Sequence, residues 1–279
     1  MVGRKSCCVA GMELIMRDFT NAKKIVIKVG TSTLTFANGS LNLKRIEELT
    51  RVITDLKNSG KEIILVSSGA IGVGISRLRL GEKPQDSPSK QALAAVGQCQ
   101  LMAIYDEFFR KYNQIVGQVL LTKDVVTNEK MHKNAVNTFV RLLKYDVIPI
   151  VNENDTISTD EIEFGDNDTL SAHVANIVGA DLLIMLTDID GLYDKNPAER
   201  GATLIPEVMK ITDEIRKNAG GAGSNLGKGG METKVLAAEI AAKSNTETII
   251  ISGEKPSLVY EIFENAQVGT HFNLNGDRK

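Results

Sequence analysis

The sequence predicts an α/β fold, a three-layer αβα sandwich with a central, mainly parallel sheet. Short β-branched apolar runs alternate with segments of helical period along the chain. Most of these runs are almost continuously hydrophobic, which is typical of strands buried on both faces of a parallel sheet. Small, polar or charged residues follow nearly every run, and ligands of such sheets lie outside the carboxyl ends of the strands. The same pattern therefore predicts a binding site at one edge of the sheet.

Six apolar runs are the expected strands, at residues 24–30, 62–68, 115–122, 147–152, 181–188 and 247–253. Two of the segments between them carry apolar residues every three or four positions. We expect helices there, with core faces formed by Ala92, Ala95, Cys99, Met102, Tyr105, Phe109 and Tyr112 in one and by Leu170, Val174, Ile177 and Val178 in the other. The sequence shows no internal repeat.

Composition excludes several classes of protein. The 279 residues are 42% hydrophobic and 24% charged, as in ordinary soluble globular proteins. A net charge of −2 and a pI of about 6.0 give no basic face for nucleic acid or a membrane surface. No apolar run approaches the roughly 20 residues that a membrane span needs. We therefore expect neither a nucleic-acid nor a membrane partner.

The cysteines and the N-terminus point to the cytoplasm. Cys7, Cys8 and Cys99 form neither a disulfide framework nor a zinc-binding spacing, which fits a reducing compartment. Glu13 and Arg17 interrupt the apolar part of the leader, so it does not resemble a secretory signal. We expect residues 1–22 to be a disordered extension and residues 23–279 to be the functional domain.

The first candidate for chemistry is Lys28, which lies inside an apolar strand two residues before Gly30. A lysine that reaches past a Gly-Thr-Ser turn can meet an anion beside the N–H groups of the turn. The alternative is a lysine on an edge strand whose head reaches water.

The second candidate is the glycine-rich stretch 219–231, which leads into a helix. Glycines let a backbone approach a ligand closely, and a helix N-terminus favours phosphate. The stretch is not a Walker A loop, because Gly229 follows Lys228 where Ser or Thr belongs, and it lacks the third glycine of a dinucleotide fingerprint. Lys234, in the first turn of that helix, is a second candidate cation, unless it is simply solvated.

The third candidate consists of two clusters of acids and amides. Asn152, Glu153, Asn154 and Asp155 follow a buried strand, and Asp166, Asn167 and Asp168 precede a helix. One residue would suffice for a helix cap, so the excess suggests that the clusters hold a substrate ammonium group or orient lysines. The alternative is a turn followed by a cap. The alternating residues 156–164 between the clusters are expected to form a small hairpin over the site.

Hydrolase chemistry is disfavoured. The three histidines, His132, His173 and His271, are scattered, and no Gly-x-Ser-x-Gly elbow occurs. We expect no metal-ligating set of side chains. A plain dinucleotide-binding dehydrogenase is also disfavoured, because the glycine fingerprint is missing.

With these motifs assembled, the chain resembles the amino acid kinase family. The matching motifs are "KVGTST" (28–33), "VSSGAIGVG" (66–74), "KQALAAVGQCQLM" (90–102), "GQVLLT" (117–122), "VNEND" (151–155), "GDNDTLSA" (165–172), "LTDIDGLY" (186–193) and "GGMETK" (229–234). They are collinear with the family over nearly all of residues 24–272. "GDNDTLSA" together with "GGMETK" singles out the family members that phosphorylate glutamate.

The resemblance implies a role for each matching residue. Lys28 and Lys234 would contact the transferred phosphoryl group, and Asp168 would organise both lysines. Glutamate would be bound by Ser68, Gly69, Asp155, Asp166 and Asn167. ATP would be bound by Lys28, Gly30, Thr187, Asp188, Lys228, Gly229, Gly230, Met231, Glu232, Thr233 and Lys234. The implied reaction is Mg²⁺- and ATP-dependent phosphorylation of the γ-carboxylate of L-glutamate, the first step of proline biosynthesis.

The resemblance also implies partners and shows departures. It implies a homo-oligomer, feedback inhibition by proline and hand-over of the acyl phosphate to glutamyl phosphate reductase. Lys228 stands where many bacterial relatives have Thr. Many relatives append a C-terminal PUA domain, and we expect none here. The open alternatives are a family member acting on N-acetylglutamate, aspartate, carbamate or uridylate, and a non-catalytic nucleotide sensor.

Overall fold

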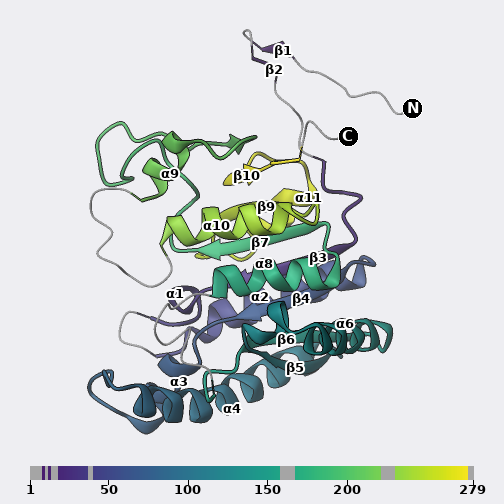
Figure 1. The fold of residues 1–279 in the computed structure, drawn as a ribbon, viewed down its shortest axis with the longest axis vertical. Coiled ribbons are helices and arrows are strands. Elements are labelled where there is room, and N and C mark those ends of the chain that lie inside the picture. Colours follow the sequence, from purple (N-terminus) through teal and green to yellow (C-terminus); the bar gives the residue numbers. More distant parts are fainter. Residues whose placement is uncertain are drawn as a thin grey trace.

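An eight-stranded sheet forms the centre of the protein in the computed structural model, which describes residues 8–9, 12–13, 18–36, 40–157, 167–220 and 230–275 (Figure 1). The strands follow the order β5-β6-β4-β3-β7-β9-β10-β8. Their bounds are β3 (Lys24–Val29), β4 (Glu62–Ser67), β5 (Ile115–Leu121), β6 (Val147–Glu153), β7 (Leu182–Thr187), β8 (Glu207–Val208), β9 (Glu247–Ser252) and β10 (Thr270–Phe272). A separate pair, β1 (Cys8–Val9) and β2 (Met12–Glu13), is antiparallel.

The six predicted strands are confirmed, and each end differs from the prediction by at most one residue. They pair in parallel throughout, and among the paired strands of the main sheet only β9 and β10 run antiparallel. The sequence did not predict β8 or β10, because two or three residues are too few to show a periodicity. The mainly parallel sheet is therefore confirmed.

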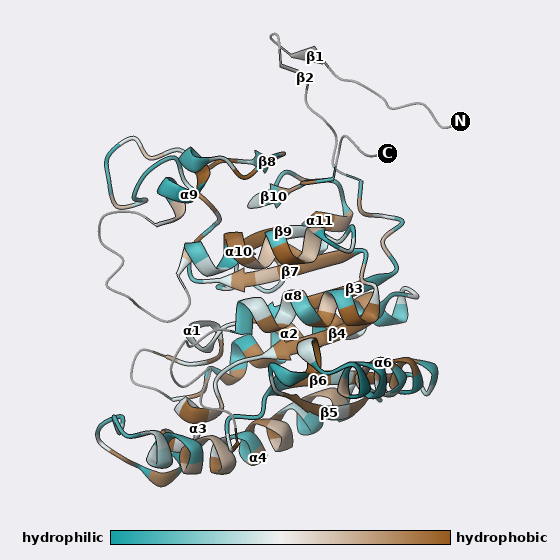
Figure 2. Ribbon diagram, in the orientation of Figure 1, coloured by the Kyte–Doolittle hydropathy of each residue, from teal (hydrophilic) through white to brown (hydrophobic). Residues whose placement is uncertain are grey.

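Helices cover both faces of the sheet and complete the three layers (Figure 1). They are α1 (Thr31–Leu34), α2 (Leu43–Asn58), α3 (Ala70–Leu78), α4 (Ser87–Lys111), α5 (Asp124–Thr127), α6 (Glu129–Lys144), α8 (Asn167–Val178), α9 (Asp213–Ala219), α10 (Met231–Ala242) and α11 (Leu258–Phe263). One apolar cluster packs α2, α4 and α11 against the sheet, and the other packs α6, α8 and α10. Figure 2 shows the hydrophobic colour along β4 and β7, between these layers.

The alternation of β3 explains where its lysine lies. Ile25, Ile27 and Val29 belong to the first apolar cluster, whereas Val26 belongs to the second. Because side chains alternate between the faces of a strand, Lys28 shares the face of Val26, against which α8 and α10 pack. The central position of β3 also removes the alternative of an edge lysine.

The predicted helix over residues 92–112 is confirmed as α4, but the first half of its predicted core face is wrong. Ala92, Ala95 and Cys99 are exposed, whereas Leu93, Ala94, Gly97 and Gln98 are buried. The reason is α3, which lies so close that a Cβ on Gly97 would come within 1.7 Å of the backbone oxygen of Ala70. The face predicted for α8 is confirmed, since Leu170, Val174 and Ile177 are buried and Val178 is partly buried.

Three further observations complete the fold. Phe19, which precedes β3, is only 6% exposed. Its ring lies nearly perpendicular to that of His271, with 5.1 Å between the ring centroids. Across the described residues, no helix is both long and apolar enough to span a bilayer. The Gly-Thr-Ser segment predicted as a turn forms the short helix α1 instead, since Thr35 N–H bonds back to Thr31.

Candidate active site

The site is built around the start of α8, where Asn167 and Asp168 are 1% and 0% exposed. Burial of a carboxylate and an amide at a helix N-terminus requires partners, because unpaired polar groups are costly away from water. The two neighbours find entirely different partners. Asp168 forms ion pairs with lysines, and Asn167 joins a chain of neutral amides.

Asp168 joins two lysines that lie far apart in the sequence. The Nζ of Lys28 lies 2.5 Å from Oδ1 of Asp168, and the Nζ of Lys234 lies 3.0 Å from Oδ2. The hydroxyl of Thr233 lies 2.9 Å from the same Oδ2 and 2.7 Å from the carbonyl oxygen of Gly230, and its one hydrogen is shared between these two acceptors. Both lysines are 5% exposed, so the solvated-lysine alternative for Lys234 is wrong. We call Lys28, Asp168 and Lys234 the ion triad; two cations and one anion give it one net positive charge.

Local structure positions each member of the ion triad. Lys28 comes from the central strand β3, and Lys234 comes from the first turn of α10, which begins after Gly230 in extended backbone. Asp168 lies in the first turn of α8, where the helix dipole favours negative charge. Three elements thus converge on one point beyond the carboxyl end of β3.

Asn167 begins a line of hydrogen-bonded amides that we call the amide relay. Its Nδ2 donates to the hydroxyl of Ser68 at 2.9 Å and to Oδ1 of Asn152 at 2.7 Å. Asn152 in turn donates to Oε1 of Gln98 at 3.0 Å, and Gln98 donates to Oε1 of Gln118 at 3.0 Å. The relay therefore runs from α8 through β6 and α4 to the edge strand β5, and the turn-and-cap alternative does not account for it.

Sequence reasoning missed Gln98 and Gln118, although both lie inside quoted motifs. A glutamine on an amphipathic helix or an edge strand looks like an ordinary surface residue. The one available signal was the position of Gln98 beside Gly97, a glycine in a helix interior that marks close packing.

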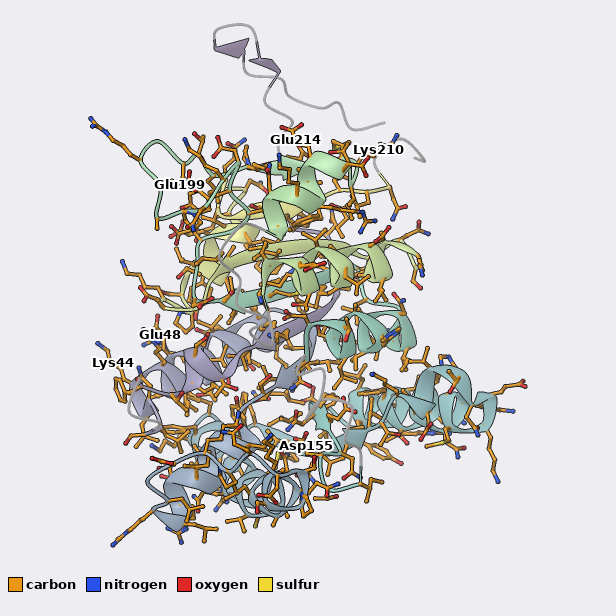
Figure 3. All side chains as sticks on the ribbon, turned by 60° about the vertical axis from the view of Figure 1, so that its left-hand side comes forward. Lys44, Glu48, Asp155, Glu199, Lys210 and Glu214 are labelled. Carbon is orange, nitrogen blue, oxygen red and sulfur yellow. The ribbon has the colours of Figure 1, made fainter. Side chains whose placement is uncertain are left out.

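The other predicted glutamate-binding residues lie at the ends of β4 and β6. Ser68 follows β4, and its N–H donates to the carbonyl of Val29 at 3.1 Å, which joins the ends of β4 and β3. Gly69 takes a φ of 108°, a left-handed conformation that favours glycine, and begins α3. Asp155 lies two residues beyond β6 and is 5% exposed, and Figure 3 shows it beside the α3–α4 layer.

The predicted nucleotide-binding residues lie on the other side of β3, toward β7. Thr187 ends β7, is buried, and donates to the carboxylate of Asp188 at 2.9 Å, while Asp188 is exposed. A Cβ on Gly30 would lie 3.8 Å from the amine of Lys28, so Gly30 borders the ion triad. Glu232 is exposed, and Gly230 and Met231 are partly buried at the start of α10. Figure 3 shows Glu199, Lys210 and Glu214 at the end of the molecule that carries α9.

Some predicted features lie outside the described residues. They are Asp166, Lys228, Gly229 and most of the hairpin expected at residues 156–164. In the described part of the chain, no group of three His, Cys, Asp or Glu side chains is arranged to hold a metal ion. His132 is exposed, His173 lies on α8 and His271 pairs with Glu247 at 2.8 Å, so none of the three joins the ion triad or the amide relay.

Residues 23–252 match the family model described as "Amino acid kinase family". The chain belongs to this family.

The curated relatives are more specific. A glutamate 5-kinase of Clostridium perfringens is 55% identical over 257 residues, which covers 90% of this chain and 96% of that protein. A glutamate 5-kinase of Listeria welshimeri is 52% identical and covers 90% of this chain and 93% of the relative.

Solved structures of low identity share the fold. A Giardia lamblia carbamate kinase bound to AMP-PNP superposes with a TM-score of 0.65 at 15% identity, over 91% of this chain and 99% of that one. An isopentenyl phosphate kinase of T. acidophilum gives a TM-score of 0.60 at 16% identity, over 90% and 100%. The three-layer fold expected from the sequence is therefore confirmed.

Proposed function

We propose that this protein transfers the γ-phosphoryl group of ATP to the γ-carboxylate of L-glutamate, which yields L-glutamyl 5-phosphate, the first intermediate of proline biosynthesis. Identity of 51–55% to several glutamate 5-kinases over about 90% of the chain supports the substrate. The observation that carries the chemistry is the buried ion triad, in which two lysines share one carboxylate.

The ion triad suits phosphoryl transfer. In such a reaction, catalysis consists mainly of positioning and of stabilising charge on the transferred group. Asp168 holds two ammonium groups at a fixed separation, so they need little reorganisation when charge develops between them. We propose that Lys28 and Lys234 contact the migrating phosphoryl group from two sides, and that Thr233 fixes the carboxylate that orients them.

The nucleophile needs no general base. A γ-carboxylate has an unperturbed pKa of about 4.3 and is ionised near neutral pH. This agrees with the absence of a histidine from the ion triad and the amide relay. The barrier is the approach of one anion to another, which explains why the site concentrates cations rather than proton acceptors.

Mg²⁺ fits this site as a companion of ATP. The carboxylate of Asp168 is already shared by two lysines, and Mg²⁺ is commonly held by substrate phosphates and water with few protein ligands. When bound, the ion neutralises part of the triphosphate charge. The nucleotide base and ribose would lie near Thr187 and Asp188, beyond the end of β7.

Glutamate would lie on the other side of the triad. We propose that Ser68, Asn167 and Asp155 bind its amino acid end, because Ser68 and Asn167 are joined by a hydrogen bond at the ends of β4 and α8. The buried Asp155 carboxylate suits an ammonium group.

A coupled assay tests the function. ADP formation should require both L-glutamate and Mg-ATP, and N-acetylglutamate, aspartate, carbamate and UMP should give background rates. Phosphorylation of N-acetylglutamate while free glutamate is ignored would reassign the substrate. Tight ATP binding without turnover on any acceptor would instead favour the nucleotide sensor.

We further propose that the enzyme works in the cytoplasm as a homo-oligomer, is inhibited by proline and hands its product to glutamyl phosphate reductase. The cysteine pattern supports the reducing compartment. An acyl phosphate hydrolyses readily, which supports hand-over. The resemblance of the motifs supports inhibition and assembly. Adding proline to the assay and measuring the mass by light scattering test these last two points.

A further inference from the structure

We propose that Gln98 is a positioning residue that fixes the orientation of the Asn167 amide, so that the Oδ1 of Asn167 faces the ammonium group of the bound amino acid. This inference rests on the proposed function in one respect, that the acceptor substrate is L-glutamate. It assigns a role to a residue that touches neither substrate.

The hydrogen bonds of the amide relay all run in one direction. An amide carries one oxygen that accepts and one NH₂ group that donates. Gln98 accepts from the Nδ2 of Asn152, so the Oδ1 of Asn152 points toward Asn167 and receives its Nδ2. Every amide in the relay therefore donates in the same sense, from α8 toward β5.

This direction leaves one acceptor, the Oδ1 of Asn167, without a donor among the described residues. The Nδ2 of Asn167 is used twice, toward Ser68 and Asn152, whereas its Oδ1 is buried and accepts no hydrogen bond within the described residues. A buried acceptor without a donor is costly, because it has lost its hydrogen bonds to water. At neutral pH both carboxylates of glutamate are ionised, so its ammonium group is the one donor it brings. The leftover oxygen and the ammonium group are therefore complementary.

The reverse orientation would oppose binding. If the Asn167 amide turned over, its NH₂ group would face the ammonium group of the substrate, donor against donor. The hydrogen bond to Ser68 does not fix the orientation of the Asn167 amide, because a hydroxyl both donates and accepts. That orientation depends on which atom of the Asn152 amide faces Asn167. The orientation of Asn152 depends in turn on its hydrogen bond with Gln98.

The surroundings of Gln98 keep its side chain in a fixed position. It is 9% exposed, and its own Nε2 is anchored on Gln118. The preceding residue, Gly97, brings α4 into backbone contact with Ala70 of α3, the helix that begins just after Ser68. The backbone that carries Gln98 and the loop that carries Ser68 therefore keep a fixed relative position.

The experiment compares Gln98→Met with Gln98→Glu in the full chain. Methionine keeps the length and removes both hydrogen bonds, whereas glutamate keeps the oxygen that accepts from Asn152. We expect Gln98→Met to raise the KM for glutamate on the order of tenfold, the size of one lost hydrogen bond to a charged group, with an unchanged KM for ATP. We expect Gln98→Glu to restore the KM for glutamate to within about threefold of the wild type, because it retains the acceptor.

Gln114→Met is the matched control, since Gln114 donates to Asn58 at 3.1 Å away from the relay and its loss should change neither KM. Glutarate, which lacks the ammonium group, should inhibit wild type and Gln98→Met equally. Equal rises in the KM values for glutamate and ATP, an unchanged KM for glutamate, or an equal loss of glutarate and glutamate binding would overturn the proposal.

The test includes a replacement variant and a check on the wild type. If thermal unfolding shows that Gln98→Met does not fold, Gln118→Met replaces it, because Gln118 is exposed and removal of its amide frees the far end of the relay. A rise confined to the KM for glutamate then supports the proposal, and no change overturns it. Failure of the wild type to phosphorylate glutamate contradicts the proposed function instead, and is seen before any variant is made.

Discussion

Asn167 and Asp168 are neighbours in the sequence, equally buried, and yet they belong to two regions built on opposite principles. The ion triad gathers full charges from β3, α8 and α10 around a carboxylate. The amide relay gathers only neutral groups from α8, β6, α4 and β5. Two adjacent residues of the sequence thus belong to a charged region and to a neutral one.

The difference corresponds to two separate tasks. A phosphoryl group in transfer is charged in every orientation, so fixed cations stabilise it without precise hydrogen-bond directions. An amino acid must be bound in one orientation, and an amide can select it because its donor and its acceptor are different atoms. Changes in the ion triad should therefore affect stability and kcat, whereas changes in the amide relay and its neighbours should affect the KM for glutamate.

The largest effect is expected from Asp168→Ala. The substitution leaves two buried ammonium groups without their shared carboxylate, so the free energy of unfolding should fall by about 3–5 kcal/mol and turnover should be lost. Chemical denaturation with the coupled assay measures both. Asp146→Asn is the control, since that acid is exposed and forms an ion pair with Lys57, and asparagine also tolerates its φ of 60°. Unchanged stability of Asp168→Ala would show that the buried charges do not depend on this carboxylate.

Lys234→Ala should act mainly on the rate. Asp168 keeps Lys28 and Thr233 as partners, so we expect the fold to persist while kcat falls on the order of 10²–10³. Steady-state kinetics and circular dichroism measure the two quantities. Lys243→Ala, at the exposed end of the same helix, should retain full activity. Near-wild-type turnover by Lys234→Ala would falsify the proposed transfer mechanism.

Asp155→Ala tests the substrate side of the comparison. We expect the KM for glutamate to rise on the order of tenfold or more, because a charge-assisted hydrogen bond to the ammonium group is lost, and the KM for ATP to stay nearly constant. Initial rates over a grid of both substrates separate the two constants. Equal changes in both would move Asp155 out of the glutamate-binding group.

The smallest effect is expected from Thr233→Val. It removes the hydroxyl that contacts Asp168 and the carbonyl of Gly230 and leaves both lysine contacts, so stability should fall by about 1 kcal/mol and kcat by a few-fold. Thr138→Val, on the exposed face of α6, serves as the control. A loss as large as that of Lys234→Ala would mean that the hydroxyl, rather than the ammonium group, carries the catalytic contact.

The same comparison explains what the sequence could predict. A lysine inside an apolar strand and an acid cluster at a helix start are unusual, so Lys28 and Asp168 stood out. Five of the six strands could be placed because almost fully buried strands leave long hydrophobic runs, and the edge strand β5 has a similar apolar run although it is partly exposed. Gln98 and Gln118 gave no such signal, because their importance depends on which amides they meet in three dimensions. The core face of α4 was wrong for a related reason, since Gly97 faces α3 and bears no side chain from which a periodicity could be read.

A structure with a non-hydrolysable ATP analogue and glutamate would show whether one carboxylate holds two lysines for a single migrating group. We expect the amines of Lys28 and Lys234 to lie within hydrogen-bonding distance, about 3 Å, of oxygens on the terminal phosphate or its bridge to the next one. A terminal phosphate bound away from either amine, with Asp168 still holding both lysines, would contradict it.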